Sequence, residues 1–82
     1  MSHVTVKLFG PEARATGRDH IDIPCDAPTT CATLRNKLAD LEPQLAPLLP
    51  AARFALNHKF ADDDALIEPH DEVALIGMVS GG

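Results

Sequence analysis

The sequence predicts an α+β fold in which a mixed β-sheet packs one of its faces against a single main helix. Residues 4–9 and 73–76, near the two ends of the chain, show the alternation of side chains that is typical of strands with one buried face. Between them, residues 31–41 repeat apolar side chains at the spacing of one helix face. A chain of 82 residues is expected to form a single domain, residues 1–82, around one small core.

The N-terminal part predicts two strands joined by a short helical turn. After the first strand, residues 12–16 have the length of one helical turn, and Arg14 lies on it. The second strand, residues 20–25, contains Pro24, which removes one ladder hydrogen bond and therefore places this strand at a sheet edge. The two strands are expected to pair as a hairpin.

The main helix is expected to begin after Thr30, because a threonine hydroxyl can accept a hydrogen bond from an amide of the first helical turn. Its apolar stripe, which should pack on the sheet, consists of Cys31, Leu34, Leu38 and Leu41. Three prolines between residues 43 and 50 prevent the helix from continuing. We expect irregular structure there, with leucines of a short helical turn covering an edge of the core.

The C-terminal half predicts further strands at residues 53–57, 59–60 and 73–76, with a tight Asn-His turn between the first two. Residues 62–64 form an acidic loop and residues 68–72 a second turn. This order of elements is that of the β-grasp, or ubiquitin-like, fold. The helical crossover brings the last strand parallel to the first, in the centre of the sheet.

Composition excludes several classes of function. With 7 basic and 12 acidic side chains the formal net charge is −5, and no basic cluster is interleaved with aromatics, so we expect a basic protein surface as partner and not nucleic acid. The chain shows no signal peptide, no membrane span and no C-x-x-C spacing, so we expect a soluble, cytoplasmic protein in which Cys25 and Cys31 are free thiols packed in the core. No metal site is expected, because the acidic loop lacks the alternation of a calcium loop and no two histidines have ligand spacing.

Strand parity leaves large apolar side chains on the sheet face opposite the helix. If alternate residues of the first and last strands face the helix, Phe9 and Ile76 face away from it. Together with Phe60 they would form an exposed apolar patch, which often marks a protein-binding surface. The alternative is that loops cover these residues.

Residues 77–82 are expected to form a flexible C-terminal tail that ends in Ser80, Gly81 and Gly82. Glycine has no side chain, so such a tail can pass through a narrow channel and deliver its carboxylate to the active site of a partner. The tail follows directly on an apolar strand, without a spacer, and should therefore leave the domain in a fixed direction. The alternative is a frayed terminus without a function.

With these residues in view, the chain resembles the MoaD and ThiS sulfur carriers along its whole length, most closely the MoaD type, the small subunit of molybdopterin synthase. The resemblance is carried by Phe9, Arg14, Gly17, residues 29–30, 34–35, 54–57, 62–64 and 71–76, and the terminal Val-Ser-Gly-Gly. The chain departs from the family pattern at His70, where a glycine is common, and at Gly77 and Met78, where two prolines are common.

The resemblance implies that Gly82 is the reactive residue. An ATP-dependent adenylating enzyme (MoeB-like) would activate its carboxylate, and a sulfur donor would convert it to a thiocarboxylate, which donates sulfur to cyclic pyranopterin monophosphate in molybdenum cofactor biosynthesis. The chain would bind no cofactor, since ATP is used by the activating partner, and it would not be catalytic without the large subunit (MoaE-like). Residues implied in partner binding are Phe9, Arg14, Phe60, Ile76, Met78, Val79, Ser80 and Gly81.

Other functions fit the same features, because a fold does not fix a function. The chain could carry sulfur for thiamin, cysteine or tRNA thiolation. It could be a ubiquitin-like modifier that Gly82 joins to lysines, or an interaction domain whose terminal glycines are accidental.

Overall fold

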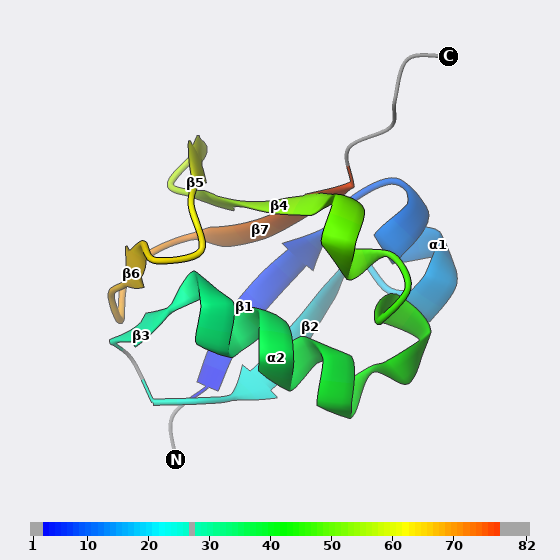
Figure 1. Cartoon of the computed structure of the whole chain (residues 1–82), viewed down its shortest axis with the longest axis horizontal. Coiled ribbons are helices and arrows are strands. Elements are labelled where there is room, and N and C mark those ends of the chain that lie inside the picture. Colours follow the sequence, from blue (N-terminus) through cyan, green and yellow to red (C-terminus); the bar gives the residue numbers. More distant parts are fainter. Residues whose placement is uncertain (1–2, 27, 78–82) are drawn as a thin grey trace.

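The computed structural model describes residues 3–26 and 28–77, whose arrangement is shown in Figure 1. In chain order the elements are β1 (His3–Leu8), α1 (Pro11–Thr16), β2 (His20–Pro24), β3 (Thr29–Thr30), α2 (Cys31–Leu41), the 3₁₀ helices η1 (Pro43–Leu45) and η2 (Leu49–Ala51), β4 (Ala52–Leu56), β5 (Lys59–Ala61), β6 (Leu66–Ile67) and β7 (Val73–Gly77). Every helix and strand that the sequence predicts is present. None of the helices in this part of the chain is long and apolar enough to cross a membrane.

Five strands form one mixed sheet in the order β2-β1-β7-β4-β5. β7 is the central strand, parallel to β1 and antiparallel to β4, as the sequence predicts. β2 pairs antiparallel with β1 and lies at the edge, where Pro24 costs no ladder hydrogen bond to a further strand. The last residue of β7, Gly77, lies opposite Ala52 of β4, so the strand includes the residue at which the tail was expected to begin.

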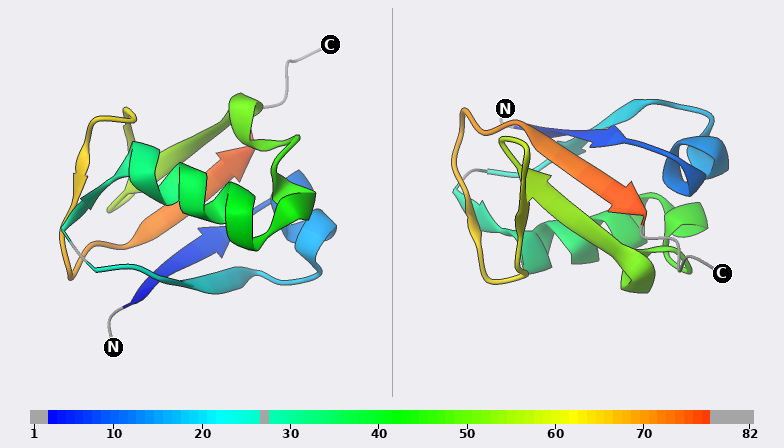
Figure 2. Two further views of the ribbon diagram at one scale, coloured as in Figure 1. Left: turned by 60° about the horizontal axis from the view of Figure 1, so that its bottom comes forward. Right: turned by 90° about the horizontal axis from the view of Figure 1, so that it is seen from above.

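The helix α2 lies across one face of this sheet (Figure 2), and the core fills the space between them. Cys31, Leu34 and Leu38 are fully buried there. Leu41 was predicted to complete the same stripe, and this is wrong, because its side chain is 51% exposed. At about 100° per residue the last position of the helix falls at the edge of the stripe, and the fully buried Leu45 of η1 fills the core beyond it.

The start of α2 is capped from two sides. The Thr30 hydroxyl accepts a hydrogen bond from the Thr33 amide at 3.2 Å, as predicted. The carbonyls of Ala65 and Asp63 accept from the amides of Cys31 and Ala32 at 3.1 and 2.8 Å. The acidic loop and the residue that follows it therefore satisfy two donors of the first helical turn that a helix cannot satisfy itself.

The sequence does not predict the small antiparallel pair of β3 and β6. Each of these strands is only two residues long, which is too short for a period of two to appear. The pair exists because the capping contacts bring the chain after the acidic loop alongside the segment that enters α2.

Candidate functional site

The sheet face opposite α2 carries a shallow hollow of about 350 Å³. We call this surface the open-face hollow, and its lining consists of Lys7, Phe9, Ala55, His58, Phe60, Glu72, Ala74 and Ile76. The side chains of Phe9 and Phe60 are 50% and 53% exposed, and Ile76 is partly buried. The predicted patch is therefore present, and the alternative that loops cover these residues is wrong.

Charged side chains stand around the apolar floor of the hollow. Glu72 lies 3.4 Å from the ammonium of Lys7 and 3.4 Å from His58 Nε2. On the other side, the Arg53 guanidinium lies 4.7 Å from the centre of the Phe60 ring. Exposed ion pairs of this kind contribute little to stability, whereas an apolar centre with a charged rim is the usual anatomy of a protein-binding surface.

The turn that carries His58 has the backbone of a tight hairpin, with positive φ angles of 52° at Asn57 and 70° at His58. The Asn57 side chain fixes this turn to the end of the neighbouring loop. Its amide donates to Asp71 Oδ1 at 2.9 Å, and its carbonyl oxygen accepts from the Glu72 amide at 3.0 Å. These contacts hold His58 and Glu72 at the rim of the hollow.

Asp71 is the acceptor at the centre of this connection. Hydrogen bonds from the Glu68 amide and from the Asn57 side chain, with a smaller contribution from the charge of His70, hold the pKa of Asp71 below its ordinary value. A carboxylate with a lowered pKa stabilises the folded state at pH values above the pKa of the unfolded chain. That contribution is lost as the pH falls through the pKa of the folded protein.

We expect Asp71→Asn to lower the free energy of unfolding at neutral pH, because asparagine is a weaker acceptor for both donors. The loss should be small, since both hydrogen bonds to the Asp71 carboxylate are exposed to solvent. The difference in the free energy of unfolding between wild type and variant should shrink as the pH is lowered through the acidic range where Asp71 takes up a proton. Urea unfolding at a series of pH values measures this, and a difference that grows toward acid pH would contradict the assignment.

The root of the predicted tail contains a residue that the sequence analysis missed. Glu12 of α1 is only 1% exposed, and none of the described residues forms a hydrogen bond with its Oε1. Its carboxyl group lies against Gly77, so that a Cβ added at position 77 would overlap Oε1 and come within 2.7 Å of Oε2. A glutamate in a short polar turn reads as a surface residue, and no local pattern signals its burial.

The remaining predicted site residues lie apart from the hollow or outside the described part. Arg14 is exposed on α1 and is not among the residues that line the hollow. Met78, Val79, Ser80, Gly81 and Gly82 lie outside the described residues. The structure thus brings together Phe9, Phe60 and Ile76, and it places Ile76 directly before the root of the tail at Gly77.

The two cysteines and the acidic loop, which could also carry chemistry, lie in surroundings that indicate a structural role. Cys25 and Cys31 are free and buried in the core, as predicted, and burial, together with the nearby Asp63 carboxylate, raises the pKa of the Cys31 thiol. The side chains of the acidic loop are exposed, as expected of a solvated turn, and Asp63 pairs with Arg35 at 2.9 Å. Within residues 3–26 and 28–77, no three His, Cys, Asp or Glu side chains could hold a metal ion together.

Comparison with known proteins relates the sequence and the fold of this chain to one family. The model of the ThiS family matches residues 6–82. The molybdopterin synthase sulfur carrier subunit of Dictyostelium discoideum is 35% identical over 81 residues, which cover 94% of this chain and 93% of that protein.

Two solved structures show the same fold. SAMP1 from Haloferax volcanii superposes with a TM-score of 0.81 at 22% identity, over 99% of this chain and 100% of that chain, and this likeness concerns the fold alone. In the complex of subunits 1 and 2 of molybdopterin-converting factor from Helicobacter pylori, the matching chain has a TM-score of 0.69 and 26% identity, covering 99% of this chain and 100% of that chain. The predicted ubiquitin-like β-grasp fold is confirmed.

Proposed function

Because the chain belongs to the ThiS/MoaD family, we propose that it is the sulfur carrier subunit of a molybdopterin synthase. The observation that carries the proposal is the identity of 35% over nearly the whole chain to a protein with that function. The relative from Helicobacter pylori, whose solved structure is a complex of two subunits, supports a large subunit as the partner.

The chemistry of the proposal is centred on the carboxylate of Gly82. A carboxylate resists attack by sulfur, because its charge repels nucleophiles and oxide is a poor leaving group. One carboxylate oxygen therefore first attacks the α-phosphorus of ATP in an adenylating partner (MoeB-like) and expels pyrophosphate. Sulfur at the oxidation level of sulfide then attacks the acyl carbon and expels AMP, leaving a thiocarboxylate.

The thiocarboxylate sulfur is a nucleophile that the large subunit (MoaE-like) directs at cyclic pyranopterin monophosphate. The acyl group that remains on Gly82 after sulfur transfer returns to a carboxylate by reaction with water. Within the described residues of this chain, no cluster of acid, base and nucleophile accompanies the tail. The chain supplies the sulfur, and the larger partner supplies the groups that bind and protonate the pterin.

The open-face hollow is the docking surface in this proposal. It ends at Ile76, and the five residues 78–82 that follow the last strand can span at most about 18 Å when extended. The active site of a partner bound to the hollow must therefore lie within about 18 Å of Gly77 to receive Gly82. The net charge of −5 fits a partner with a basic surface, and the two free thiols fit the cytoplasm.

The test is the intact mass of the protein purified from its own host. We expect a species whose mass corresponds to the exchange of one oxygen for sulfur, and fragmentation should place the exchange on Gly82. The same species should form in vitro from the purified chain, ATP, an adenylating partner and a sulfur donor. The proposal would be contradicted if the sulfur-containing species were found neither in the protein from its host nor after the reaction in vitro.

The acceptor decides between molybdopterin synthesis and its alternatives. A thiocarboxylated chain that yields no dithiolene with a large subunit and the pterin would carry sulfur for thiamin, cysteine or tRNA instead. Covalent ladders on a denaturing gel, in place of the thiocarboxylate, would reveal a ubiquitin-like modifier.

A further inference from the structure

A buried carboxyl group and a glycine meet at the point where the described part of the chain ends. Glu12 is 1% exposed, and it reaches from α1 to Gly77, the last residue of β7. The φ angle of Gly77 does not lie in the left-handed region that favours glycine. The backbone would therefore accept an alanine, but its methyl group would have to displace the carboxyl group of Glu12.

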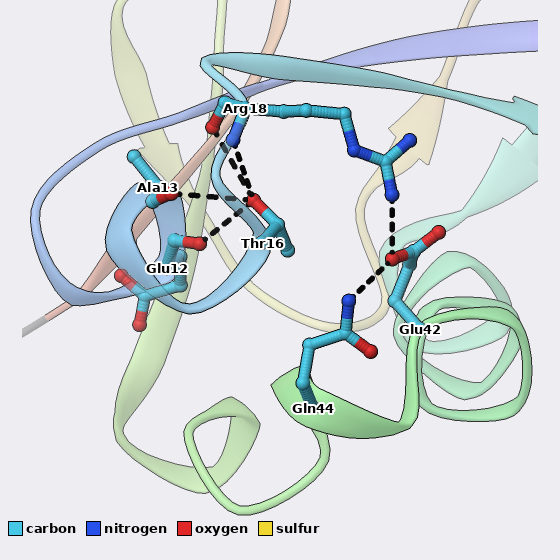
Figure 3. A network of polar contacts seen from close by, with 6 residues as sticks. All are labelled: Glu12, Ala13, Thr16, Arg18, Glu42 and Gln44. Atoms are coloured by element: carbon cyan, nitrogen blue, oxygen red, sulfur yellow. Dashed lines mark hydrogen bonds and ion pairs between the residues drawn. The ribbon is translucent and has the colours of Figure 1, made fainter.

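A network of polar contacts holds the helix from which Glu12 projects (Figure 3). The Thr16 hydroxyl lies 3.1 Å from the Glu12 carbonyl oxygen and 3.2 Å from the Arg18 amide. The Arg18 guanidinium and the Gln44 side-chain amide both donate to Glu42 Oε1 at 2.9 Å. These contacts connect α1 to the end of α2 and to η1, so the backbone at Glu12 has a defined position relative to the main helix.

The carboxyl group of Glu12 takes no part in this network. Figure 3 shows it on the side of α1 away from Arg18 and Glu42, and no hydrogen bond from the described residues reaches Oε1. Burying a carboxylate oxygen without a hydrogen-bond partner is unfavourable, so the position of Oε1 calls for an explanation. The contact with Gly77 places this group beside the start of the C-terminal segment.

We propose that Glu12 is a positioning residue that fixes the direction in which the C-terminal segment leaves β7. Its carboxyl group occupies the space beside Gly77 that a side chain would fill, and it is anchored through α1 to α2. The last residue of β7 is thereby held against the helical layer as well as within the sheet. This inference rests on the proposed function only for its consequence, which is that Gly82 is presented to the partner along a defined path.

The first arm of the test needs no partner. The backbone order parameter S² from ¹⁵N relaxation should be about 0.85 for the Gly77 amide of the wild-type chain and should fall below about 0.6 in Glu12→Ala. Glu12→Gln keeps the shape of the side chain and should retain the order at Gly77. Asp40→Ala removes an exposed carboxylate of α2 and is the matched control.

The second arm measures single-turnover sulfur transfer from the thiocarboxylated chain to the pterin at a saturating concentration of the large subunit. A small error in the placement of a reacting group costs about 10-fold to 100-fold in rate, so Glu12→Ala should transfer that much more slowly. Its Kd for the large subunit should stay close to that of the wild type, because the open-face hollow is unchanged. Glu12→Gln should recover the rate.

A double-mutant cycle identifies the contact itself. Gly77→Ala alone should lower both the order and the rate, since its methyl group displaces the carboxyl group of Glu12. Combined with Glu12→Ala it should add nothing, because both substitutions remove one contact. Should Glu12→Ala fail to fold, Gly77→Ala alone makes the same prediction in both arms.

The inference would be overturned if the order parameter at Gly77 kept its wild-type value in both Glu12→Ala and Gly77→Ala. It would also be overturned if the effects of the two substitutions added up in the double variant. If the wild type and Glu12→Ala transfer sulfur at the same rate, the inference about Glu12 is overturned and the proposed function remains intact. If the wild type itself transfers no sulfur, the proposed function fails, and the order parameters still decide whether Glu12 controls Gly77.

Discussion

Deletion of Gly82 should abolish sulfur transfer and leave the fold unchanged. The deletion places the carboxylate on Gly81, one residue short of the position at which the proposed function requires it. Adding one alanine after Gly82 should have the same effect, because the carboxylate then belongs to a residue with a side chain and lies about 3.5 Å too far along an extended chain. We expect the single-turnover rate to fall by at least about 100-fold in both variants, as misplaced reacting groups do.

Thermal unfolding and the affinity for the large subunit are the controls for this experiment. Both should stay at wild-type values, because the core and the open-face hollow lie within residues 3–77. A variant that binds the large subunit and still transfers sulfur would refute the assignment of Gly82. A variant that has lost binding would show that the terminal residue contributes mainly to docking.

Phe60→Asp should weaken binding of the large subunit by about 2 kcal/mol or more, which corresponds to at least about 30-fold in Kd. Phe60 is 53% exposed in the free chain and lines the open-face hollow. The free protein therefore tolerates a carboxylate there, whereas the complex would bury that charge against an apolar partner surface. Ile76→Asp should act in the same direction, and titration calorimetry measures both.

Leu41→Asp is the matched control, because Leu41 is 51% exposed but lies at the end of α2, away from the sheet face that carries the hollow. It should change the Kd by less than about twofold, as surface substitutions away from an interface do. Equal effects of Leu41→Asp and Phe60→Asp would point to a general effect of charge. Unchanged affinity in Phe60→Asp and Ile76→Asp would exclude the hollow as the docking surface.

The patch could be predicted because strand geometry fixes it locally. In a strand successive side chains alternate between the two faces, so the burial of Leu8 and Leu75 on the helix side determines that Ile76 faces away. The same local logic predicted the N-cap at Thr30 and the turn at Asn57, since each depends on residues at most three positions apart. The exposure of Leu41 is the exception, because a helix stripe does not say where the sheet beneath it ends.

By itself, the sequence determined the strands, the main helix, the central place of the last strand and the side of the sheet on which Phe9 and Ile76 lie. Only the tertiary structure decided which parts of these elements are in contact: the carbonyls of Asp63 and Ala65 at the start of α2, the short pair of β3 and β6, and the burial of Glu12 against Gly77. The physical reason is the distance along the chain between the residues that interact. Periodicity and caps follow from bonds between near neighbours in the chain, whereas Glu12 and Gly77 are 65 positions apart in the sequence and meet only once β1, β7 and α1 have packed.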